Sequence, residues 1–362
     1  MTSAFSLDGL RRWPDFEAPE LRAWDAADTL ILDEAAARLD GTEVVVIGDD
    51  FGALTLGALH RGAARVRVHQ DSLVSEAALR ANGTGNYSHL PLGADLLQGA
   101  TLVLLRLPRS LDALDQIAAL IAAHADPAVT VIAGGRIKHM SLSMNEVLAR
   151  HFSRVDVSLA RQKSRLLVAS GPRLGIVAEP QRAFHDDLGL WVVSTGGAFA
   201  GTSVDIGTRA LLGVLDGAPE FDSAIDLGCG TGILAARLKR LRPDADVLAS
   251  DRSAAAVLSA QLTMEANGLS VTVTRDDALS RVPDGSVDLV VLNPPFHTGA
   301  AVHSGLATSL FEAAARVLRP GGELWTVWNS HLGYKGALRR IVGETREVAR
   351  TPKFTVTAST KG

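Results

Sequence analysis

The sequence predicts an α/β protein of two tandem doubly wound domains, each with a mostly parallel sheet covered by helices on both faces. Its 362 residues are enough for two domains of ordinary size. In both halves, short apolar segments alternate with longer helical segments, as in sheets whose parallel strands are joined by helices. The order of these segments is the same in the two halves, which indicates an internal duplication. We place the domains at residues 1–178 and 183–362.

The composition is that of a folded globular protein, with 47% hydrophobic and 21% charged residues. No apolar run reaches the roughly 20 residues that a membrane span requires, and the N-terminal segment has acidic residues and proline where a signal peptide is apolar. The single cysteine, Cys229, excludes a disulfide within the chain, and no His, Cys or carboxylate group has the spacing of metal ligands. We therefore expect a cytoplasmic monomer with no membrane contact and no metal.

The charge distribution bears on whether the partner is a nucleic acid. The formal net charge is −4, which argues mildly against one, because neutralising phosphates requires a basic face. However, two segments are locally basic, residues 150–182 and residues 335–361. The basic residues of the first segment are Arg150, Arg154, Arg161, Lys163, Arg165, Arg173 and Arg182. The distribution is therefore compatible with an RNA partner despite the acidic total.

The C-terminal half contains the elements of one complete domain. Its expected strands are residues 223–226, 244–250, 271–274, 287–292 and 323–328, and its expected helices are residues 233–241, 254–266 and 304–317. Asn267-Gly268 is typical of a helix C-cap, and we expect Pro320-Gly321-Gly322 to stop the third helix. Helices that connect successive strands in this way require the strands to run parallel.

The N-terminal half repeats this order. We expect strands at residues 42–47, 66–69, 102–105 and 129–132, a helix at 53–60, and a terminal antiparallel hairpin that closes at 160–170, where the C-terminal half has 349–359. Asp71 follows Gly48, the first glycine of the turn in its half, by the same number of residues as Asp251 follows Gly228. This spacing pairs Asp71 with Asp251.

The two halves differ where a ligand would bind. Asp50 stands in place of Gly230, Phe51 in place of Thr231, and Arg106-Leu-Pro-Arg109 in place of Asn293-Pro-Pro-Phe296. A side chain at the position of Gly230 would block the close approach of the backbone to a ligand. We therefore expect the N-terminal domain to be a degenerate copy that serves RNA binding or scaffolding.

A glycine-rich turn follows the first strand of the C-terminal half, in Asp226-Leu-Gly228-Cys-Gly230-Thr-Gly232. Alternate glycines let the backbone bend beneath a ligand and contact it. The spacing differs from the dinucleotide fingerprint, and no Lys-Ser/Thr pair follows as in a phosphate loop. Asp251 ends the next strand, where it could accept ribose hydroxyls or cap a helix. After the third strand, Asp277 is favoured over Asp276 as the acceptor of an adenine amine.

Asn293-Pro294-Pro295-Phe296 follows a fully apolar strand, so it lies at the same edge of the sheet as the glycine turn. The two prolines remove N–H donors and fix the backbone, which leaves the Asn293 amide oxygen and the Pro294 carbonyl as acceptors. Such acceptors suit a planar –NH2 group, whose lone pair they free for attack on a sulfonium methyl. Phe296 offers a ring face on which a base can stack.

These two motifs resemble those of amino-group methyltransferases with a Rossmann-like fold. Other segments make nearly the whole chain similar to the bacterial ribosomal RNA guanine-N2 methyltransferases, and the match after residue 329 is closer to the large-subunit enzymes. These segments are Phe199, Asp205-Ile-Gly207-Thr208, His297, Asn329-Ser-His331 and Lys353-Phe354.

The resemblance implies two tandem Rossmann-like domains, each with a seven-stranded, mostly parallel sheet, of which only the C-terminal one is active. It implies S-adenosylmethionine as the cofactor and ribosomal RNA, free or in a ribosomal subunit, as the partner. The cofactor would be held by Asp226, Gly228, Gly230, Asp251 and Asp277, with Asp205 helping to close the site. The flipped guanine would be held by Asn293, Pro294, Pro295 and Phe296.

Two alternatives remain open at this point. The same acceptor row suits adenine N6 in a nucleic acid or a glutamine side chain in a protein, because both are planar –NH2 groups. A protein that only binds RNA and retains the fold is a different class, against which the intact glycine turn, Asp251 and Asn293-Pro-Pro-Phe296 argue.

Overall fold

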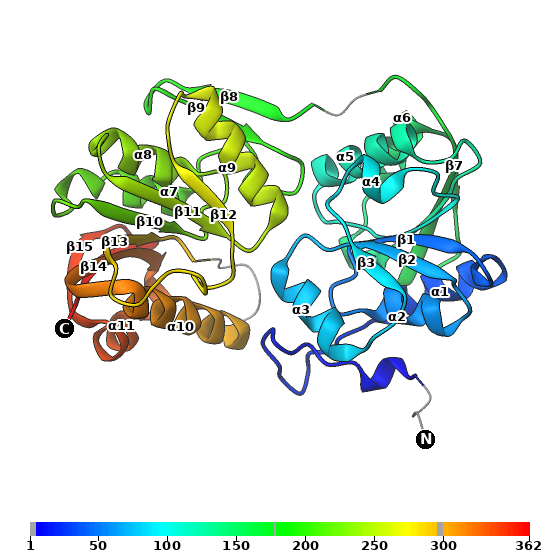
Figure 1. The fold of residues 1–362 in the computed structure, drawn as a ribbon, viewed down its shortest axis with the longest axis horizontal. Coiled ribbons are helices and arrows are strands. Elements are labelled where there is room, and N and C mark those ends of the chain that lie inside the picture. The colour runs from blue at the N-terminus through cyan, green and yellow to red at the C-terminus, as the bar shows by residue number, and fades with distance from the viewer. Residues whose placement is uncertain (1–4, 177–178, 295–299) are drawn as a thin grey trace. The chain divides into compact units, whose positions relative to one another are not determined.

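The structure, a computed structural model, describes residues 5–176, 179–294 and 300–362, with the helix backbone but not the side chains of residues 300–304. The chain divides into two compact units, Met1–Glu179 and Pro180–Gly362. Each unit contains one seven-stranded sheet, and a separate two-stranded sheet precedes the second. Figure 1 shows the order of the elements along the chain.

The N-terminal unit is built around a sheet with the strand order β3-β2-β1-β4-β5-β7-β6. Its strands are β1 (Glu43–Ile47), β2 (Arg65–His69), β3 (Tyr87–His89), β4 (Leu102–Arg106), β5 (Thr130–Arg136), β6 (Phe152–Val157) and β7 (Ser164–Pro172). Its helices are η1 (Leu7–Gly9), α1 (Ala26–Leu39), α2 (Ala53–His60), α3 (Leu73–Asn82), α4 (Ala94–Leu97), α5 (Leu111–His124), η2 (Ile137–His139) and α6 (Leu142–His151). Strands β1 to β5 pair in parallel, and β7 pairs antiparallel with β5 and β6.

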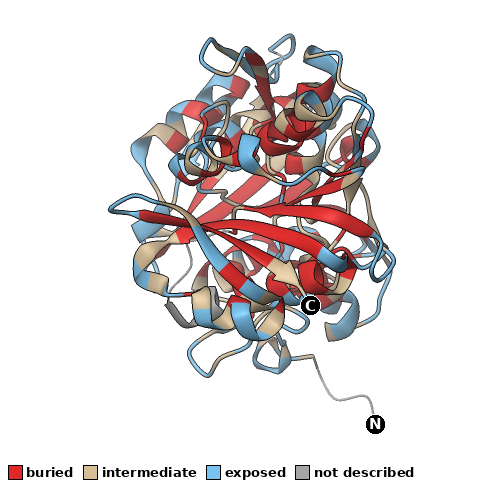
Figure 2. Ribbon diagram, turned by 90° about the vertical axis from the view of Figure 1, so that its left-hand side faces the viewer, coloured by how far each residue is buried: buried red, intermediate tan, exposed pale blue. Residues whose placement is uncertain are grey.

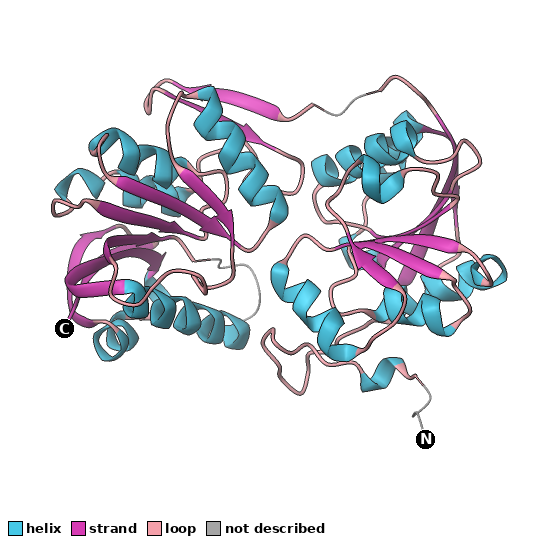
Figure 3. Ribbon diagram, in the orientation of Figure 1, coloured by secondary structure: helices cyan, strands magenta, loops and turns pink. Residues whose placement is uncertain are grey.

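The C-terminal unit repeats this topology, with the order β12-β11-β10-β13-β14-β16-β15. Its strands are β8 (Gln181–His185), β9 (Leu190–Ser194), β10 (Ser223–Leu227), β11 (Asp246–Asp251), β12 (Thr272–Arg275), β13 (Val287–Leu292), β14 (Leu318–Asn329), β15 (Gly343–Arg350) and β16 (Phe354–Lys361). Its helices are α7 (Ile206–Leu212), η3 (Leu215–Gly217), α8 (Ile233–Leu241), α9 (Ala254–Ala266), α10 (Ala300–Val317), η4 (Ser330–Leu332) and α11 (Lys335–Ile341). Two tandem Rossmann-like domains are therefore confirmed, and helices lie on both sides of each sheet (Figure 3).

The cores lie on both faces of the sheets. Strand β13 is buried at every position, as expected for a parallel strand covered on both sides. Figure 2 shows that buried residues concentrate on the central strands, while the outer helix faces and loops are exposed. Leu289 and Val291 of β13 pack in one core cluster and Val290 and Leu292 in another, because successive side chains point to opposite faces.

The helices begin where the sequence offers caps. Asp25 forms a capping box at the start of α1, and Ser253 accepts a hydrogen bond from Ala256 at the start of α9. Helices α2 and α8 instead follow glycines in the left-handed conformation, Gly52 and Gly232. Within the described residues, every helix is too short or too polar to cross a membrane.

One expectation about the elements was wrong, and one hairpin was missed. Pro320-Gly321-Gly322 does not stop a helix, because α10 ends at Val317 and β14 begins directly at Leu318. The proline lies where the register against β13 shifts, between Val287 and Leu289, since a residue without an N–H fits where the ladder is interrupted. The β8–β9 hairpin was not predicted at all.

Candidate active site

The candidate site lies at the carboxyl edge of the C-terminal sheet. Strand β10 is in the middle, with Leu227 paired to Ser250 of β11 and to Leu292 of β13. The glycine turn, Asp251 and Asn293 follow at the ends of these three strands. The structure therefore brings the predicted cofactor motif and the start of the predicted substrate motif to one edge, where open α/β sheets bind ligands.

The three glycines of the turn have two different structural roles. All three have positive φ, at 69°, 53° and 79° for Gly228, Gly230 and Gly232. A Cβ at Gly228 or Gly230 would meet no atom within 4 Å, so both face open space. A Cβ at Gly232 would lie 2.8 Å from Met264 and 3.1 Å from Ala260 of α9. Gly228 and Gly230 thus leave room for a ligand, whereas Gly232 lets α8 pack against α9.

Asp226 lies beneath this turn and is 1% exposed. Its Oδ2 accepts a hydrogen bond from the N–H of Ala235 in the first turn of α8 at 2.9 Å, and its Oδ1 has no partner among the residues that the structure describes. Burial raises the pKa of Asp226 to about 7, and the hydrogen bond from Ala235 only partly opposes this rise. A cationic ligand at the turn would favour the ionised form of this carboxyl.

Asp251 connects the glycine turn to helix α9. Its Oδ2 accepts from the N–H of Gly230 at 3.1 Å, and its Oδ1 accepts from the N–H of Ser253 at 2.9 Å. The residue that caps α9 is Ser253 rather than Asp251. Asp251 therefore links the glycine turn to the start of α9 through both of its carboxylate oxygens.

Asp276 and Asp277 follow β12 and differ in what they bind. Asp276 is 6% exposed, and its carboxylate accepts hydrogen bonds from Ser280 Oγ at 2.5 Å and from the Arg281 N–H at 3.1 Å. Asp277 is only half-buried. The Asp276 carboxylate thus stabilises its own turn, and the choice of Asp277 over Asp276 as a ligand residue stays a prediction.

The amide of Asn293 has a fixed orientation. Its Nδ2 donates to Asp205 Oδ2 at 3.2 Å and to Thr208 Oγ1 at 3.0 Å, which uses both of its hydrogens. Its Oδ1 is buried and has no partner among the described residues. Asp205 is itself held as the N-cap of α7 by the N–H groups of Gly207 and Thr208. The first turn of α7 therefore determines which end of the amide is left as an acceptor.

Gly207 provides the space for this amide. A Cβ at Gly207 would lie 3.0 Å from Asn293 Oδ1 and 3.0 Å from Asp205 Oδ2. The sequence could not reveal the roles of Gly207 and Thr208, because nothing in the spacing connects them to Asn293. The only signal was the segment Asp205-Ile-Gly207-Thr208, which carried part of the family resemblance.

Part of the predicted substrate motif lies outside the described residues. Pro294 is described and buried. Pro295, Phe296 and His297 fall within 295–299, which the structure does not describe. Their proposed roles therefore rest on the sequence.

Cys229, Trp325 and Trp328 are buried near the site and have structural roles. Burial raises the pKa of the Cys229 thiol well above its ordinary value, so it is a poor nucleophile. Trp325 and Trp328 are buried in the two cores of the C-terminal unit. In the ranges 5–176, 179–294 and 300–362, no cluster of His, Cys, Asp and Glu is arranged to hold a metal ion.

The N-terminal unit has a closed ion cluster where the C-terminal unit has Asn293. Arg106 ends β4 as Asn293 follows β13, and it donates to Asp25 at 2.9 and 3.1 Å. It also lies 3.2 Å from Asp28, which is almost fully buried. Asp25 caps α1 as Asp205 caps α7, so the two clusters occupy equivalent positions. In the N-terminal unit, the side chains of Arg106, Asp25 and Asp28 thus occupy the position that the Asn293 amide has in the C-terminal unit.

Burial raises the pKa of Asp28 to about 7, and the charge of Arg106 opposes this rise. Burial also disfavours ionisation of Asp25, but the hydrogen bond and the charge of Arg106 hold its pKa below the ordinary value. Arg106 is therefore the partner on which both carboxyls depend.

In the N-terminal unit, the carboxylate beneath the glycine turn comes from a different position in the chain than in the C-terminal unit. Val46 occupies the strand position of Asp226, as the pairing to the neighbouring strands shows. Asp49, in the turn itself, accepts instead from the N–H of Thr55 at 2.8 Å and of Gly52 at 3.0 Å. Thr55 in α2 corresponds to Ala235 in α8, so the same helix N–H is satisfied from a different place in the chain.

The pairing of Asp71 with Asp251 was wrong by one residue. Gly48 donates to the carbonyl of His69, whereas Gly228 donates to that of Ser250. Gln70, not Asp71, therefore occupies the position of Asp251. Its amide donates to the carbonyls of Asp49 and Ser75, so the N-terminal unit has an amide where the C-terminal unit has a carboxylate.

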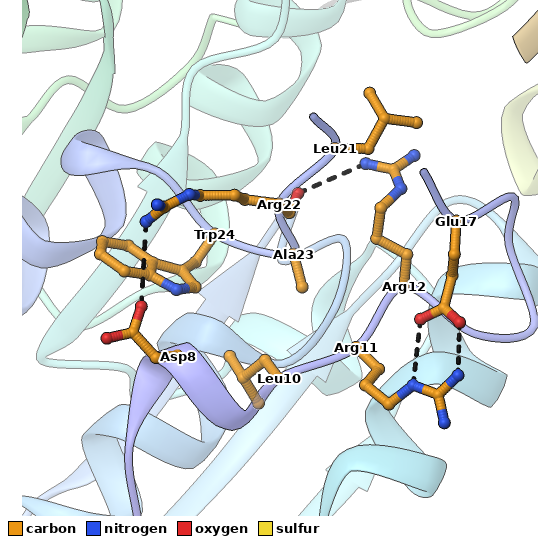
Figure 4. A pocket seen from close by; sticks show the side chains of 9 residues that line it. All are labelled: Asp8, Leu10, Arg11, Arg12, Glu17, Leu21, Arg22, Ala23 and Trp24. Atoms are coloured by element: carbon orange, nitrogen blue, oxygen red, sulfur yellow. Dashed lines mark hydrogen bonds and ion pairs between the residues drawn. The ribbon is translucent and has the colours of Figure 1, made fainter. Parts of the chain in front are cut away.

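The N-terminal segment covers the glycine turn of its own unit. The Arg12 guanidinium lies 4.5 Å from the centre of the Phe51 ring, and Asn82 donates to the carbonyls of Arg11 and Phe51. A cavity of about 300 Å³ lies within this segment (Figure 4). It is lined by Asp8, Leu10, Arg11, Arg12, Glu17, Leu21, Arg22, Ala23 and Trp24. Its three arginines pair with Glu17, Asp15 and Asp8, so it offers no unpaired charge to an anion.

Comparison with known proteins covers both units. Residues 1–173 match the RLMG N-terminal domain, and residues 189–358 match the methyltransferase small domain. The chain is 37% identical to the ribosomal RNA large subunit methyltransferase G of Streptomyces coelicolor, over 100% of both chains. It is 33% identical to the protein of the same name from Shewanella amazonensis, again over 100% of both.

One solved structure resembles both units together. It is a 16S rRNA N2 methyltransferase of T. thermophilus in complex with AdoMet and guanosine. The TM-score is 0.77 at 22% identity, covering 96% of this chain and 95% of that one. At this identity the likeness establishes the tandem fold.

Proposed function

Because the chain belongs to the family of the ribosomal RNA large subunit methyltransferase G proteins, we propose that it transfers a methyl group from S-adenosylmethionine to the exocyclic N2 amine of a guanine in large-subunit ribosomal RNA. The observation that carries this proposal is the amide of Asn293. Two neighbours fix its nitrogen, and its oxygen is buried without a partner in the described parts of the chain. A buried acceptor left unsatisfied is unfavourable, so the site is suited to a ligand that donates an N–H there.

The residues around the glycine turn fit S-adenosylmethionine. Gly228 and Gly230 face open space, and Asp226 has a buried oxygen without a partner. We assign Asp251 to the ribose hydroxyls, Asp277 to the adenine amine, and Asp226 and Asp205 to the remainder of the site. When bound, S-adenosylmethionine supplies a methyl group made electrophilic by its sulfonium.

The chain's own residues would prepare the amine. Asn293 Oδ1 and the Pro294 carbonyl would each accept one N–H of the guanine N2 group, which steers the nitrogen toward a tetrahedral geometry and frees its lone pair. Pro295 would keep the backbone rigid, and Phe296 would stack on the extruded base. No strong base is required, because the proton can leave after the methyl group has been transferred.

We assign a supporting role in RNA binding to the N-terminal unit. Four of the positions that would serve a cofactor or an amine differ there: Val46, Asp50, Gln70 and Arg106 replace Asp226, Gly230, Asp251 and Asn293. The unit nevertheless retains a complete sheet and core. A fold that is kept without its catalytic site is expected to serve binding or assembly.

The test is transfer of a labelled methyl group from S-adenosylmethionine into RNA and protein from cells that lack the gene, with the product identified by mass spectrometry. The expected product is N2-methylguanosine in large-subunit ribosomal RNA. Detection of N6-methyladenosine, or of label in protein, would mean that the substrate is a different one, while the cofactor assignment would stand. Absence of label from free RNA and from isolated subunits, with the cofactor bound, would favour a protein that only binds RNA.

Replacing Thr208 by valine should reduce kcat about fivefold without changing cofactor binding. The change removes one of the two acceptors that orient the Asn293 amide, and a hydrogen bond of this kind contributes about 1 kcal/mol. The measurement is kcat and the KM for RNA, together with the affinity for S-adenosylhomocysteine by calorimetry. Thr208→Ser should restore kcat. If serine and valine behave alike, the hydroxyl does not orient the amide.

Affinity for S-adenosylmethionine should fall as the pH drops below about 7. The pKa of Asp226 is raised to about 7, and the ionised carboxylate binds the cationic cofactor best. Binding below this pH must therefore release a proton, and the affinity falls by up to about tenfold per pH unit. Calorimetry between pH 5.5 and 8.5 measures the slope. An Asp226→Asn variant should bind more weakly at pH 8 and show a flat profile; a wild-type slope in that variant would assign the titration to another group.

A further inference from the structure

The carboxyl edge of the N-terminal sheet carries four cations. Arg109 follows β4, Arg136 ends β5, Lys138 lies in η2, and Lys163 lies in the turn that precedes β7. None of the four forms an ion pair or a side-chain hydrogen bond within the part of the chain that the structure describes. Arg109, Lys138 and Lys163 are exposed, and Arg136 is half-buried. We name these four residues the basic edge.

Backbone hydrogen bonds hold the basic edge together. The N–H of Leu107 donates to the carbonyl of Gly134 at 2.9 Å, which joins the loop after β4 to the end of β5. The N–H of Ile137 donates to the carbonyl of Lys163 at 3.0 Å, which joins η2 to the turn before β7. Desolvation and the positive charges of Arg109 and Lys138 lower the pKa of His139, so these charges lie near one another. The edge is one surface rather than four scattered residues.

Several acids near this surface already have cationic partners. Asp25 and Asp28 bind Arg106, whose side chain contributes to the closed cluster and not to the surface. The charge of Arg136 also lowers the pKa of Asp25. Asp33 binds Arg61 and Arg161, and Asp112 in the first turn of α5 is the nearby acid that forms no ion pair within the described residues. Arg109, Lys138 and Lys163 therefore give the edge a positive charge that exceeds the nearby negative charge, in a chain whose net charge is −4.

The duplication provides an internal comparison for the basic edge. The N–H of Ser330 donates to the carbonyl of Lys353 in the C-terminal unit, as the N–H of Ile137 does to Lys163. In this alignment Arg136 and Lys138 correspond to Asn329 and His331, and Arg109 corresponds by position to Phe296. Three of the four cations thus stand where the catalytic copy has neither lysine nor arginine. The positive charge accompanies the loss of catalytic residues at the same edge.

We propose that the basic edge binds phosphates of the RNA substrate, so that the edge which holds the cofactor in one unit holds the nucleic-acid backbone in the other. The proposal rests on ribosomal RNA being the substrate. Unpaired, exposed cations neutralise phosphates with release of counterions, which makes the affinity dependent on salt. The contact is to the backbone, so it positions the RNA and does not select its sequence.

The test compares two triple variants. The edge variant is Arg109→Gln, Lys138→Gln and Lys163→Gln. The control is Arg38→Gln, Arg65→Gln and Arg173→Gln, which removes three exposed cations from α1, the start of β2 and the segment after β7, at the opposite edge of the same sheet. Binding of protein-free large-subunit ribosomal RNA is measured by fluorescence anisotropy between 50 and 300 mM salt.

The edge variant should bind more weakly, and its log–log salt slope should be shallower by about 2 to 3, since each lost phosphate contact changes the slope by roughly 0.7–0.9. The control should keep the wild-type slope, and both variants should bind S-adenosylhomocysteine as the wild type does. Equal slopes for all three proteins, or an equal loss in edge variant and control, would overturn the proposal.

Measurements of methyl transfer distinguish a failure of this proposal from a failure of the proposed function. With the wild type active on ribosomal RNA, the edge variant should raise the KM for RNA at least tenfold and leave kcat unchanged. An unchanged KM would overturn the proposal that the basic edge binds RNA phosphates, and it would not affect the proposed function. A wild type that methylates no RNA would overturn the proposed function, and the salt slopes would still decide whether the edge binds RNA.

Discussion

An Asn293→Ala variant is expected to lose methyl transfer by roughly 100- to 1,000-fold, the usual effect of removing one preset hydrogen-bonding group from an active site. The physical reason is that the amide oxygen is the acceptor that holds the target amine. Thr208 and Asp205 fix the amide before the substrate arrives, so its orientation costs nothing at the moment of reaction. Single-turnover transfer of labelled methyl to large-subunit ribosomal RNA measures the loss.

Cofactor affinity distinguishes this role from a structural one. Asn293→Ala should bind S-adenosylhomocysteine with the wild-type affinity, because the glycine turn and Asp251 do not depend on the amide. A parallel loss of cofactor binding and of transfer would mean that Asn293 supports the fold of this edge rather than the reaction.

An Arg106→Ala variant should be destabilised by about 3 kcal/mol, since it leaves Asp25 and Asp28 without their shared cation in a largely buried cluster. For a unit of this size the loss corresponds to a drop in Tm of roughly 10 °C. Thermal unfolding followed by circular dichroism measures it. The matched control is Arg109→Ala, three residues further along, which is exposed and unpaired and should change stability by less than about 0.5 kcal/mol.

Two further measurements bear on the same cluster. Adding Asp25→Asn and Asp28→Asn to Arg106→Ala should recover part of the loss, because the uncompensated charges are removed. Asp28 has a folded pKa above its unfolded value, so its ionisation destabilises the folded state as the pH rises from about 4 through 7. The deficit of Arg106→Ala should therefore shrink as the pH falls. Equal Tm values for Arg106→Ala and Arg109→Ala would contradict the role of the cluster.

Local patterns predicted the elements next to the glycine turns well. The expected helices at 53–60, 233–241 and 254–266 and the expected strand at 287–292 have the same bounds in the structure. Glycines and caps mark where these elements begin and end. The β8–β9 hairpin was missed because tertiary contacts hold it: Asn267 and Thr263 of the α9 region bond the backbone of β9. Such contacts leave no periodic signal in the sequence.

The site was predictable as a set of motifs but not as an arrangement. Asn293 was identified from its position after an apolar strand, yet its partners Asp205 and Thr208 precede it by 88 and 85 residues. The assignment of Asp71 failed because counting residues cannot detect a one-residue difference in the connection between a helix and a strand. Only the backbone hydrogen bonds from Gly48 and Gly228 reveal it.

The displaced carboxylate beneath the N-terminal glycine turn affects how the two units could have diverged. In the catalytic unit the N–H in the first turn of α8 depends on Asp226, a residue that also faces the cofactor edge. In the N-terminal unit Asp49 has taken over that bond, so Val46 is free of it. Changing Val46 alone to aspartate would therefore place two carboxyls beneath α2. Removing the carboxyl of Asp49 alone would leave the Thr55 N–H without this partner. Positions 46 and 49 would have to change together, so the divergence of the N-terminal unit from the catalytic one is difficult to reverse by single substitutions.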